Sequence, residues 1–172
     1  MYYHTNYSSP VGELTLCCHD NHLVGLWLEG QKYFGGSLSG EMVSGDSPVL
    51  SQAKSWLDHY FTGDRPDPKQ LPLAPEGSAF RQMVWQCLLD IPYGQTMTYG
   101  QLAQQVAHGL NRPSMSARAV GNAAGHNPIS IIIPCHRLVG SDHSLTGYAG
   151  GLERKRFLLR HENCSLALQQ WA

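Results

Sequence analysis

The sequence predicts an α+β fold in which a small N-terminal α/β unit is followed by a mainly helical C-terminal unit. Short runs of strand-type composition and one amphipathic helical segment occupy the first part of the chain, and helical patterns dominate the second. Between them lies a Pro-rich stretch over residues 66–75, which is typical of a stiff, extended connection. We therefore expect one domain over residues 1–77, connector included, and a second domain over residues 78–172.

The N-terminal unit is expected to contain a β-hairpin and a helix. Residues 12–18 and 23–28 have strand-type composition, and the Asp20-Asn21 pair between them is typical of a hairpin turn. Beyond a Gly/Ser-rich stretch, apolar residues recur at helical spacing from Pro48 to Phe61. These elements account for the α/β character of the first 77 residues.

The C-terminal unit begins with two helices whose starts are marked by capping residues. Ser78 precedes a segment with apolar residues at helical spacing, so we expect it to cap a helix. Thr98 followed by Gln101 has the pattern of a capping box, in which each side chain bonds the other residue's backbone N–H. A second helix with an apolar face is therefore expected to begin at Tyr99.

A shorter helix is expected to begin near Ala117, after a linker that breaks the helical pattern. Ala117, Val120 and Ala124 share one face of this helix. Arg118 and Asn122, four residues apart, lie on a different, exposed face, where the second helix of DNA-binding helix-turn-helix motifs carries its contact residues. Helix pairs also occur in proteins that bind no nucleic acid, so this pattern alone leaves both interpretations open.

The net charge of −1 is unevenly distributed along the chain. Residues 1–77 hold four Lys and Arg against nine Asp and Glu, a balance of −5, whereas residues 78–172 hold eight against four, a balance of +4. A local basic excess attracts phosphate backbones. Half of the basic residues in the second part belong to one helical run, formed by Arg154, Lys155, Arg156 and Arg160. Such a run is either a solvated surface or a DNA contact, and the sequence leaves both open.

The cysteines and the hydropathy pattern restrict the class of protein. The five cysteines are odd in number and irregularly spaced, which argues against a disulfide framework and favours a reducing compartment. Cys17, Cys18 and His19 lack the ligand spacing of zinc sites, so no metal is expected. No apolar stretch is long enough to span a membrane, and the N-terminus lacks the pattern of a secretion signal. We expect a cytoplasmic protein that does not associate with membranes.

The most informative motif is Pro134–Arg137, which reads Pro-Cys-His-Arg and directly follows the apolar run Ile129–Ile133. A thiol beside a histidine and an arginine lies in an electropositive setting, which favours the reactive thiolate. Because Pro134 cannot continue a central strand, we expect a turn that contains Cys135 and His136. Cys135 is therefore a candidate nucleophile.

Further motifs surround this one in a fixed order along about half of the chain. They are Ile91–Gly94, Thr98–Ala103, Ala117–Gly121, Asn127–Pro128, Ile133–Arg137, Gly147–Gly151, Leu158–Leu159 and His161–Glu162. With them, the chain from Phe80 onward resembles the O6-alkylguanine-DNA alkyltransferases, also called methylated-DNA–protein-cysteine methyltransferases. The resemblance implies a ribonuclease-H-like N-terminal domain and a winged helix-turn-helix C-terminal domain. The stretch between residues 104 and 117 is longer than is usual in that family, and Ser130 stands where some relatives have proline.

The resemblance also implies the chemistry. Cys135 would accept the alkyl group from O6 of guanine, with O4-alkylthymine as a further candidate substrate. His136 would act as the base through a bound water, Glu162 would hold His136, and Asn127 would fix the turn beneath the site. The resulting thioether has no good leaving group, so each molecule would repair one lesion, without any cofactor.

The implied partner is double-stranded DNA that contains O6-alkylguanine, bound through the minor groove by a protein that is expected to be a monomer. The damaged base must leave the stack before the thiol reaches it. Arg118 would enter the vacated space and Tyr99 would crowd the neighbouring phosphate, with Ala117 and Asn122 beside Arg118 on the DNA-binding helix. The residues implied to line the base pocket are Tyr99, Ile133, Tyr148, Ala149 and Gly150.

Two other classes of function remain open at this point. A cysteine hydrolase would use the same Cys-His-Glu arrangement but would need an oxyanion hole that the sequence does not identify. A non-enzymatic binder of DNA lesions would keep Tyr99 and Arg118 but would lack the cysteine. The presence of Cys135 argues against such a binder.

Overall fold

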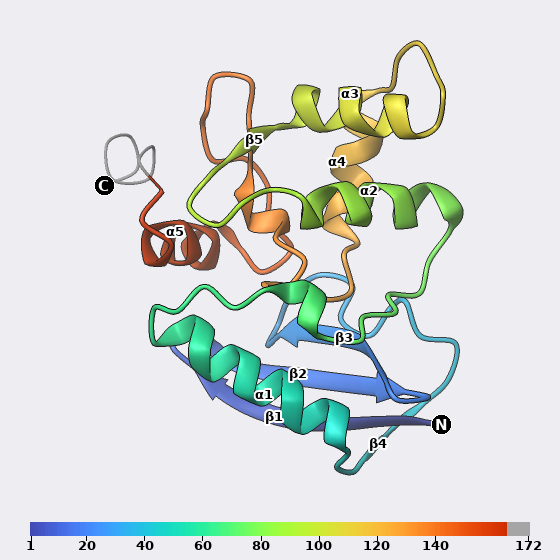
Figure 1. Ribbon diagram of the computed structural model, residues 1–172, viewed down its shortest axis with the longest axis vertical. Helices are drawn as coiled ribbons and strands as arrows, with labels where there is room; N and C mark the ends of the chain where they lie inside the picture. Colours follow the sequence, from blue (N-terminus) through green and yellow to red (C-terminus); the bar gives the residue numbers. More distant parts are fainter. Residues whose placement is uncertain (165–172) are drawn as a thin grey trace. The chain divides into compact units, whose positions relative to one another are not determined.

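The computed structural model describes residues 1–164, which form two compact units (Figure 1). The first unit consists of Met1–Glu76 together with a short inserted segment, Pro128–Ser130. The second unit consists of Gly77–Asn127 and the described residues from Ile131 onward. One unit is built on a sheet and the other on helices, which confirms the predicted α+β class. The insertion of residues 128–130 into the first unit was not expected from the sequence.

The first unit contains a four-stranded sheet with the order β3-β2-β1-β4. Its strands are β1 (Tyr2–Ser9), β2 (Gly12–His19), β3 (His22–Leu28) and β4 (Met42–Ser44). β1, β2 and β3 are antiparallel neighbours, whereas β4 pairs with β1 in parallel. The hairpin between β2 and β3 is confirmed, and its turn residues Asp20 and Asn21 have φ angles of 48° and 63°, which match the left-handed turn that hairpins favour. β1 and β4 were not predicted.

One face of the sheet is covered by α1 (Pro48–Phe61), which begins and ends where the sequence predicts. The Ser47 side chain caps the helix by accepting a hydrogen bond from the Leu50 backbone N–H. The face of α1 that packs inward is apolar, and Leu50 and Leu57 on it are completely buried. One part of the core of the first unit therefore lies between this helix and the sheet, and a separate buried cluster is formed by Tyr2, Cys17, Val24 and Trp27.

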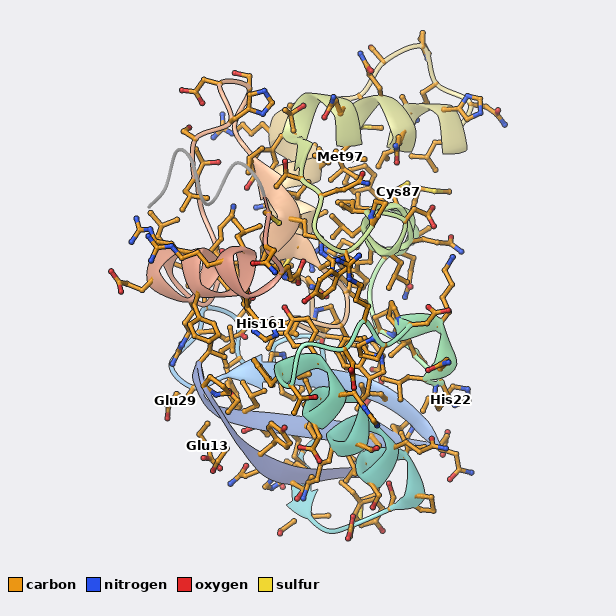
Figure 2. All side chains as sticks on the ribbon, turned by 60° about the vertical axis from the view of Figure 1, so that its left-hand side comes forward. Glu13, His22, Glu29, Cys87, Met97 and His161 are labelled. Carbon is orange, nitrogen blue, oxygen red and sulfur yellow. The ribbon has the colours of Figure 1, made fainter. Side chains whose placement is uncertain are left out.

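The outer edge of β3 is paired with two short segments of chain. Leu23 pairs with Leu73, and Leu26 pairs with Ile129, each in a parallel arrangement. A β-bulge makes both pairings possible: Cys17 of β2 lies opposite Gly25, but Cys18 lies opposite Leu23, so that Val24 has no partner on β2. At one end of this hairpin the Glu29 N–H donates to the Glu13 carbonyl, and Figure 2 shows both residues there, with His22 at the opposite end.

The second unit is built from three helices that pack against one another, a small sheet and a fourth helix. The helices are α2 (Ala79–Leu89), α3 (Tyr99–Gly109), α4 (Ala117–Gly125) and α5 (Leu152–His161), and β5 (Met97–Thr98) pairs in parallel with β6 (Leu138–Val139). Short 3₁₀ turns lie at η1 (Pro68–Gln70) in the first unit and at η2 (Cys135–Arg137) in the second. No helix within residues 1–164 is long and apolar enough to cross a membrane.

The helix starts in the second unit agree with the capping patterns. The Ser78 side chain accepts from the Arg81 N–H, and the capping box of Thr98 and Gln101 is complete in both directions. The inward face of α4 differs from the prediction at one position, because Val120 and Ala124 are buried whereas Ala117, in the first turn, is exposed. Ala123, which was not expected inside, is buried and accepts a hydrogen bond from the Trp85 indole at 2.9 Å.

Candidate active site

The Pro-Cys-His-Arg motif forms a buried turn. The apolar run Ile129–Ile133 is buried as expected, but it is not a regular strand, because only Ile129 pairs with a strand residue. Ile131 has a φ of 71°, a left-handed conformation that is strained for a β-branched residue. Cys135 then starts the 3₁₀ turn η2, so the turn predicted at Pro134 is confirmed.

Asn127 holds this turn from the end of α4. Its side-chain amide donates to the Ile133 carbonyl at 2.8 Å and to the Cys135 sulfur at 3.3 Å. Asn127 is buried, so both bonds are formed away from water, where an unpaired amide would be costly. The amide thus fixes the chain before the cysteine and the thiol itself.

The acidity of the thiol differs from the sequence-based expectation. An electropositive setting was expected to favour the thiolate, but the pKa of Cys135 is raised. Burial has the largest effect, because it disfavours the charged form, and it outweighs both the hydrogen bond from Asn127 and the positive charge of Lys155. The resting thiol is therefore protonated, and its use as a nucleophile requires a base.

The base candidate is His136, which belongs to a network of buried charged groups. Its Nε2 lies 2.6 Å from Glu162 Oε2, and the Arg137 Nε donates to Glu162 Oε1 at 2.7 Å. Arg137 also donates to the Ile91 carbonyl at 2.6 Å. Burial alone would raise the pKa of Glu162, but its interactions with His136 and with the positively charged Arg137 hold it well below its usual range. Glu162 is therefore an ionised, buried carboxylate rather than a surface one.

The other ring nitrogen of His136 is available for proton transfer. Nδ1 is buried and has no hydrogen-bond partner among the described residues. Burial lowers the pKa of His136, although Glu162 acts in the opposite direction, so the ring is neutral near pH 7. Because Nε2 faces a carboxylate, the tautomer with its proton on Nε2 is favoured, and this leaves a lone pair on Nδ1. A neutral histidine with a free lone pair can accept a proton.

Lys155 was assigned to a basic run on the helix surface, and the structure corrects this. The side chain is completely buried, and its Nζ donates to the carbonyls of Thr146 and Gly147 at 2.9 and 3.1 Å. Burial lowers its pKa to about 8, although the nearby Cys135 acts in the opposite direction. The spacing offered a signal, because residues 155, 158 and 159 fall on one helix face and the latter two are apolar.

Tyr99 is connected to the loop that Lys155 holds. Its hydroxyl donates to the Thr146 carbonyl at 3.1 Å, the same oxygen that Lys155 bonds. The ring packs over Gly121 of α4, where a Cβ would come within 3.3 Å of it. This loop, between β6 and α5, carries the predicted pocket residues Tyr148, Ala149 and Gly150, all of which are half-buried. Ile133, the remaining pocket residue, is completely buried beside Asn127.

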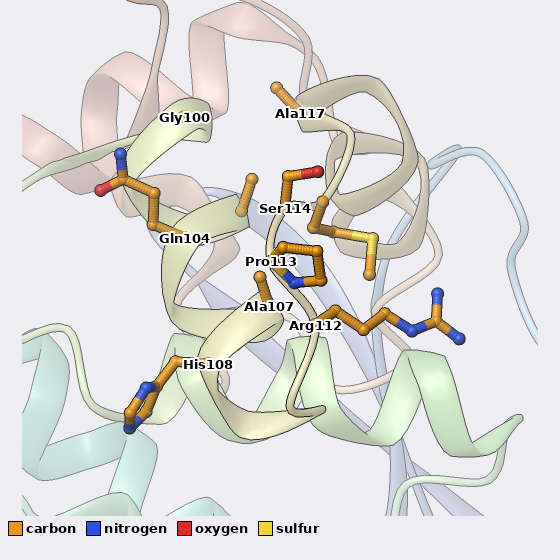
Figure 3. A pocket seen from close by; sticks show the side chains of 10 residues that line it. Gly100, Gln104, Ala107, His108, Arg112, Pro113, Ser114 and Ala117 are labelled. Atoms are coloured by element: carbon orange, nitrogen blue, oxygen red, sulfur yellow. The ribbon is translucent and has the colours of Figure 1, made fainter.

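Of the candidate DNA-binding residues, Tyr99 lies on α3 and is half-buried, whereas the other three lie on α4. Arg118 and Asn122 are exposed as predicted, and so is Ala117. The long turn between α3 and α4 borders a hollow of about 530 Å³ (Figure 3). Gln104 and His108 line it from α3, and Figure 3 shows the Arg112 side chain extending from the turn away from that helix. Both Arg112 in the turn and Arg118 on α4 are exposed.

A second hollow also borders α3 and shares Gln104 and His108 with the first. It is lined by residues from the end of α2, from the chain before β5 and from α3, among them Cys87 and Met97, both labelled in Figure 2. Within residues 1–164, no group of three or more His, Cys, Asp or Glu side chains is placed to hold a metal ion. Cys17 and Cys18 are buried in β2.

The chain is similar to known proteins over nearly its whole length. Two family models match it, namely the ribonuclease-like domain of 6-O-methylguanine DNA methyltransferase over residues 1–75 and the DNA binding domain of 6-O-methylguanine DNA methyltransferase over residues 79–164. A methylated-DNA–protein-cysteine methyltransferase from Haemophilus influenzae is 42% identical over 93% of this chain and 86% of its own length. One from Methanosarcina barkeri is 40% identical over 95% and 99%. The crystal structure of Mycobacterium tuberculosis OGT in complex with DNA matches with a TM-score of 0.78 at 40% identity, covering 94% of this chain and 92% of that chain.

Proposed function

Because the chain belongs to the 6-O-methylguanine DNA methyltransferase family, we propose that Cys135 is the residue that takes the alkyl group from damaged DNA. The protein binds DNA and repairs it by transferring an alkyl group to a cysteine. Of its five cysteines, Cys135 is the one followed by a histidine that is paired with a buried carboxylate. This pairing is the observation that carries the assignment.

The proposed reaction starts with removal of the thiol proton. Since burial raises the pKa of Cys135, the thiol needs a base, and His136 Nδ1 supplies one through an intervening water. Protonation turns His136 into a cation, which the ionised Glu162 stabilises at 2.6 Å. Asn127 keeps the sulfur in place by donating to it, and a donor of this kind also stabilises the thiolate that forms.

The transfer itself is a single displacement at carbon. The thiolate uses an electron pair to bond the alkyl carbon of O6-alkylguanine while the carbon–oxygen bond breaks, and the electrons of that bond remain on the guanine, which then takes up a proton. The product is unmodified guanine in DNA and a thioether on Cys135. A thioether has no good leaving group for water to displace, so each protein molecule reacts once.

The substrate base has to leave the duplex before it can react, because the alkyl carbon is inaccessible inside the stack. Arg118, exposed on α4, is the proposed occupant of the vacated space, with Ala117 and Asn122 beside it against the minor groove. Tyr99, held by Thr146 and packed on Gly121, is the proposed wall of the pocket. Tyr148, Ala149, Gly150 and Ile133 complete the proposed pocket. The acting species is proposed to be a monomer.

The experiment that tests this proposal is intact-protein mass spectrometry after incubation with duplex DNA containing O6-methylguanine, followed by peptide mapping. We expect one added methyl group per protein, on the peptide that contains Cys135. Cys135→Ser should show no added mass while still binding the duplex, and Cys87→Ser, at a less buried thiol, should react like the unchanged protein. Methylation of Cys135→Ser would contradict the assignment. Binding of the lesion without any added mass in the unchanged protein would indicate a lesion binder instead.

A further inference from the structure

The segment that leads to the active-site turn is held by the sheet of the first unit. The Leu26 N–H donates to the Pro128 carbonyl at 2.8 Å, and the Ser130 N–H donates to the Leu26 carbonyl at 3.0 Å. These two bonds are the repeating pattern of a parallel ladder. Pro128–Ser130 is therefore joined to β3 by a single parallel bridge centred on Ile129, and the chain passes into the second unit at Ile131, four residues before the thiol.

The bulge in β3 is what directs Leu26 toward this segment. The backbone N–H and C=O groups of successive strand residues point to opposite edges. Leu23 and Leu26, three positions apart, would therefore normally form hydrogen bonds with different neighbouring strands. Because Val24 is an extra residue with no partner on β2, the backbone N–H and C=O groups of Leu23 and Leu26 both point to the outer edge of β3. A glycine is needed at position 25, because the Trp27 ring occupies the place where a Cβ would stand.

The ladder ends at Ser130 because a side chain occupies its next position. In a continued parallel ladder the Leu28 N–H would bond the Ser130 carbonyl. Instead, it donates to Gln31 Oε1 at 2.7 Å. The same Oε1 accepts the Ser130 hydroxyl at 3.3 Å, and Gln31 Nε2 donates to the Lys32 carbonyl at 3.1 Å. Gln31 and Ser130 are both buried, so these contacts are shielded from water.

The end of the ladder coincides with the strained residue. Immediately after Ser130, Ile131 adopts its φ of 71°, and the chain then turns to place the Ile133 carbonyl on the Asn127 amide. A strained backbone persists only where its surroundings fix it from both sides. After Ile131, the hydrogen bond from Asn127 to the Ile133 carbonyl fixes the chain. Before Ile131, the hydrogen bonds of Ser130 fix it.

We propose that Gln31 is a positioning residue for alkyl transfer: together with Ser130 it ends the pairing on β3 at a defined residue and thereby sets where the turn that carries Cys135 begins. The proposal rests on Cys135 as the alkyl acceptor. It gives the N-terminal sheet a role in the reaction, through a residue that touches neither thiol nor substrate. Gln31 would act by fixing the position of Cys135. A small displacement of a nucleophile is sufficient to slow a reaction.

The test compares four variants with the unchanged protein, using three measurements on each. The variants are Gln31→Met, Ser130→Ala, the double variant and Gln31→Glu, and the measurements are the rate of methyl transfer from duplex DNA, the affinity for undamaged duplex, and thermal unfolding. Gln31→Met should slow transfer about tenfold and leave affinity for undamaged DNA unchanged. Ser130→Ala should slow it about threefold, and the double variant should be no slower than Gln31→Met, because both residues act through one contact. Gln31→Glu keeps the acceptor oxygen and should recover most of the rate.

Tyr2→Phe is the matched control. It removes hydrogen bonds to Ser39 and Glu76 in the same unit and leaves Pro128–Ser130 untouched, so it should lower the unfolding temperature without slowing transfer. Transfer by Gln31→Met at the unchanged rate, or equal slowing by Tyr2→Phe, would overturn the proposal. If Gln31→Met fails to fold, the test depends on Ser130→Ala. An unchanged rate of transfer in Ser130→Ala would also overturn the proposal. Absence of methylation at Cys135 in the unchanged protein would overturn the acceptor assignment instead.

Discussion

The second unit contains two groups of charged residues that differ in their surroundings. Around the thiol, Arg137, Lys155 and Glu162 are buried, and each is bonded to named partners. By contrast, Arg118 on α4 and Arg112 in the turn before it are exposed. Buried charges are costly to disturb, because a partner that loses its counterpart stays desolvated, whereas exposed charges are screened by water and salt. From this difference we expect that changes to the buried charges alter methyl transfer and stability, and that changes to the exposed arginines alter the response to duplex DNA.

Among the charged residues, the largest effect is expected for Glu162→Gln. The change removes the negative charge that both His136 and Arg137 face, so His136 loses the group that stabilises its protonated form. We expect methyl transfer to slow by about 10²-fold and the free energy of unfolding to fall by about 3 to 5 kcal/mol. Single-turnover transfer rates and denaturant unfolding measure the two effects. Glu153→Gln, at an exposed position of α5, the helix that Glu162 follows, should change neither.

The same network gives stability a defined pH dependence. The folded-state pKa values of His136 and Glu162 both lie below their ordinary values of 6.5 and 4.5, so the unfolded chain binds protons first as the pH falls. The stabilisation from Glu162 is therefore complete above about pH 4.5 and is lost on further acidification, while His136 adds a loss that begins near pH 6.5. In Glu162→Gln, the free energy of unfolding should depend less on pH below about pH 4.5 than in the unchanged protein. The same pH dependence of unfolding in both proteins would contradict this prediction.

The next largest effect is expected for Lys155→Met, which keeps the length of the side chain but removes its charge. Lys155 lowers the pKa of Cys135, so its removal should raise that pKa further and slow transfer about tenfold at neutral pH. The rate should recover as the pH rises, and a pH–rate profile shows this shift. Arg156→Met on the partly exposed part of the helix is the control. A uniformly lower rate with an unshifted profile would indicate a purely structural role.

A smaller effect, restricted to duplex substrates, is expected for Arg118→Ala. Arg118 is exposed and outside the buried network, so transfer from free O6-methylguanine should be unchanged. Transfer from duplex DNA should slow about tenfold, because the cost of extruding the base, a few kcal/mol, is no longer offset by an inserted side chain. Equal slowing with duplex DNA and with free O6-methylguanine would mean that Arg118 affects the transfer step itself. The exposed and the buried charges would then not have separate roles.

The smallest effect is expected for Arg112→Ala, in the long turn before α4. An exposed arginine that contacts a phosphate adds affinity without reading sequence. The variant should bind undamaged duplex about threefold less tightly, and the slope of log affinity against log salt should decrease by about one. Lys54→Ala in α1 serves as the control. An unchanged salt slope would mean that this turn does not contact DNA.

The elements that the sequence predicted correctly are those whose signals are local. Ser78 and the Thr98–Gln101 pair specify helix starts through contacts within four residues, and Asp20-Asn21 specifies its turn in the same way. β4 was missed because three residues within a Gly/Ser-rich stretch carry no usable period, and it forms only by pairing with β1, far along the chain.

The motif around Cys135 predicted a nucleophile with a neighbouring base, but the energetics of the site depend on tertiary burial. The neighbouring sequence suggested an acidic thiol, and the interior reversed this, because desolvation outweighs the nearby cation. Lys155 was likewise hidden among exposed basic residues of its helix. The contact between Gln31 and Ser130 joins residues 99 positions apart, and a local sequence pattern cannot predict such a contact.

The occupied edge of β3 also bears on the solubility of the chain. Its outward N–H groups at Leu23, Leu26 and Leu28 are taken by Pro72, Pro128 and Gln31, so this edge offers no template on which another molecule's strand could add. A fragment that ends at residue 77 would lack Pro128–Ser130 and would present the Leu26 backbone groups to its neighbours. Such a fragment should self-associate into β-rich aggregates, and the intact protein should resist doing so.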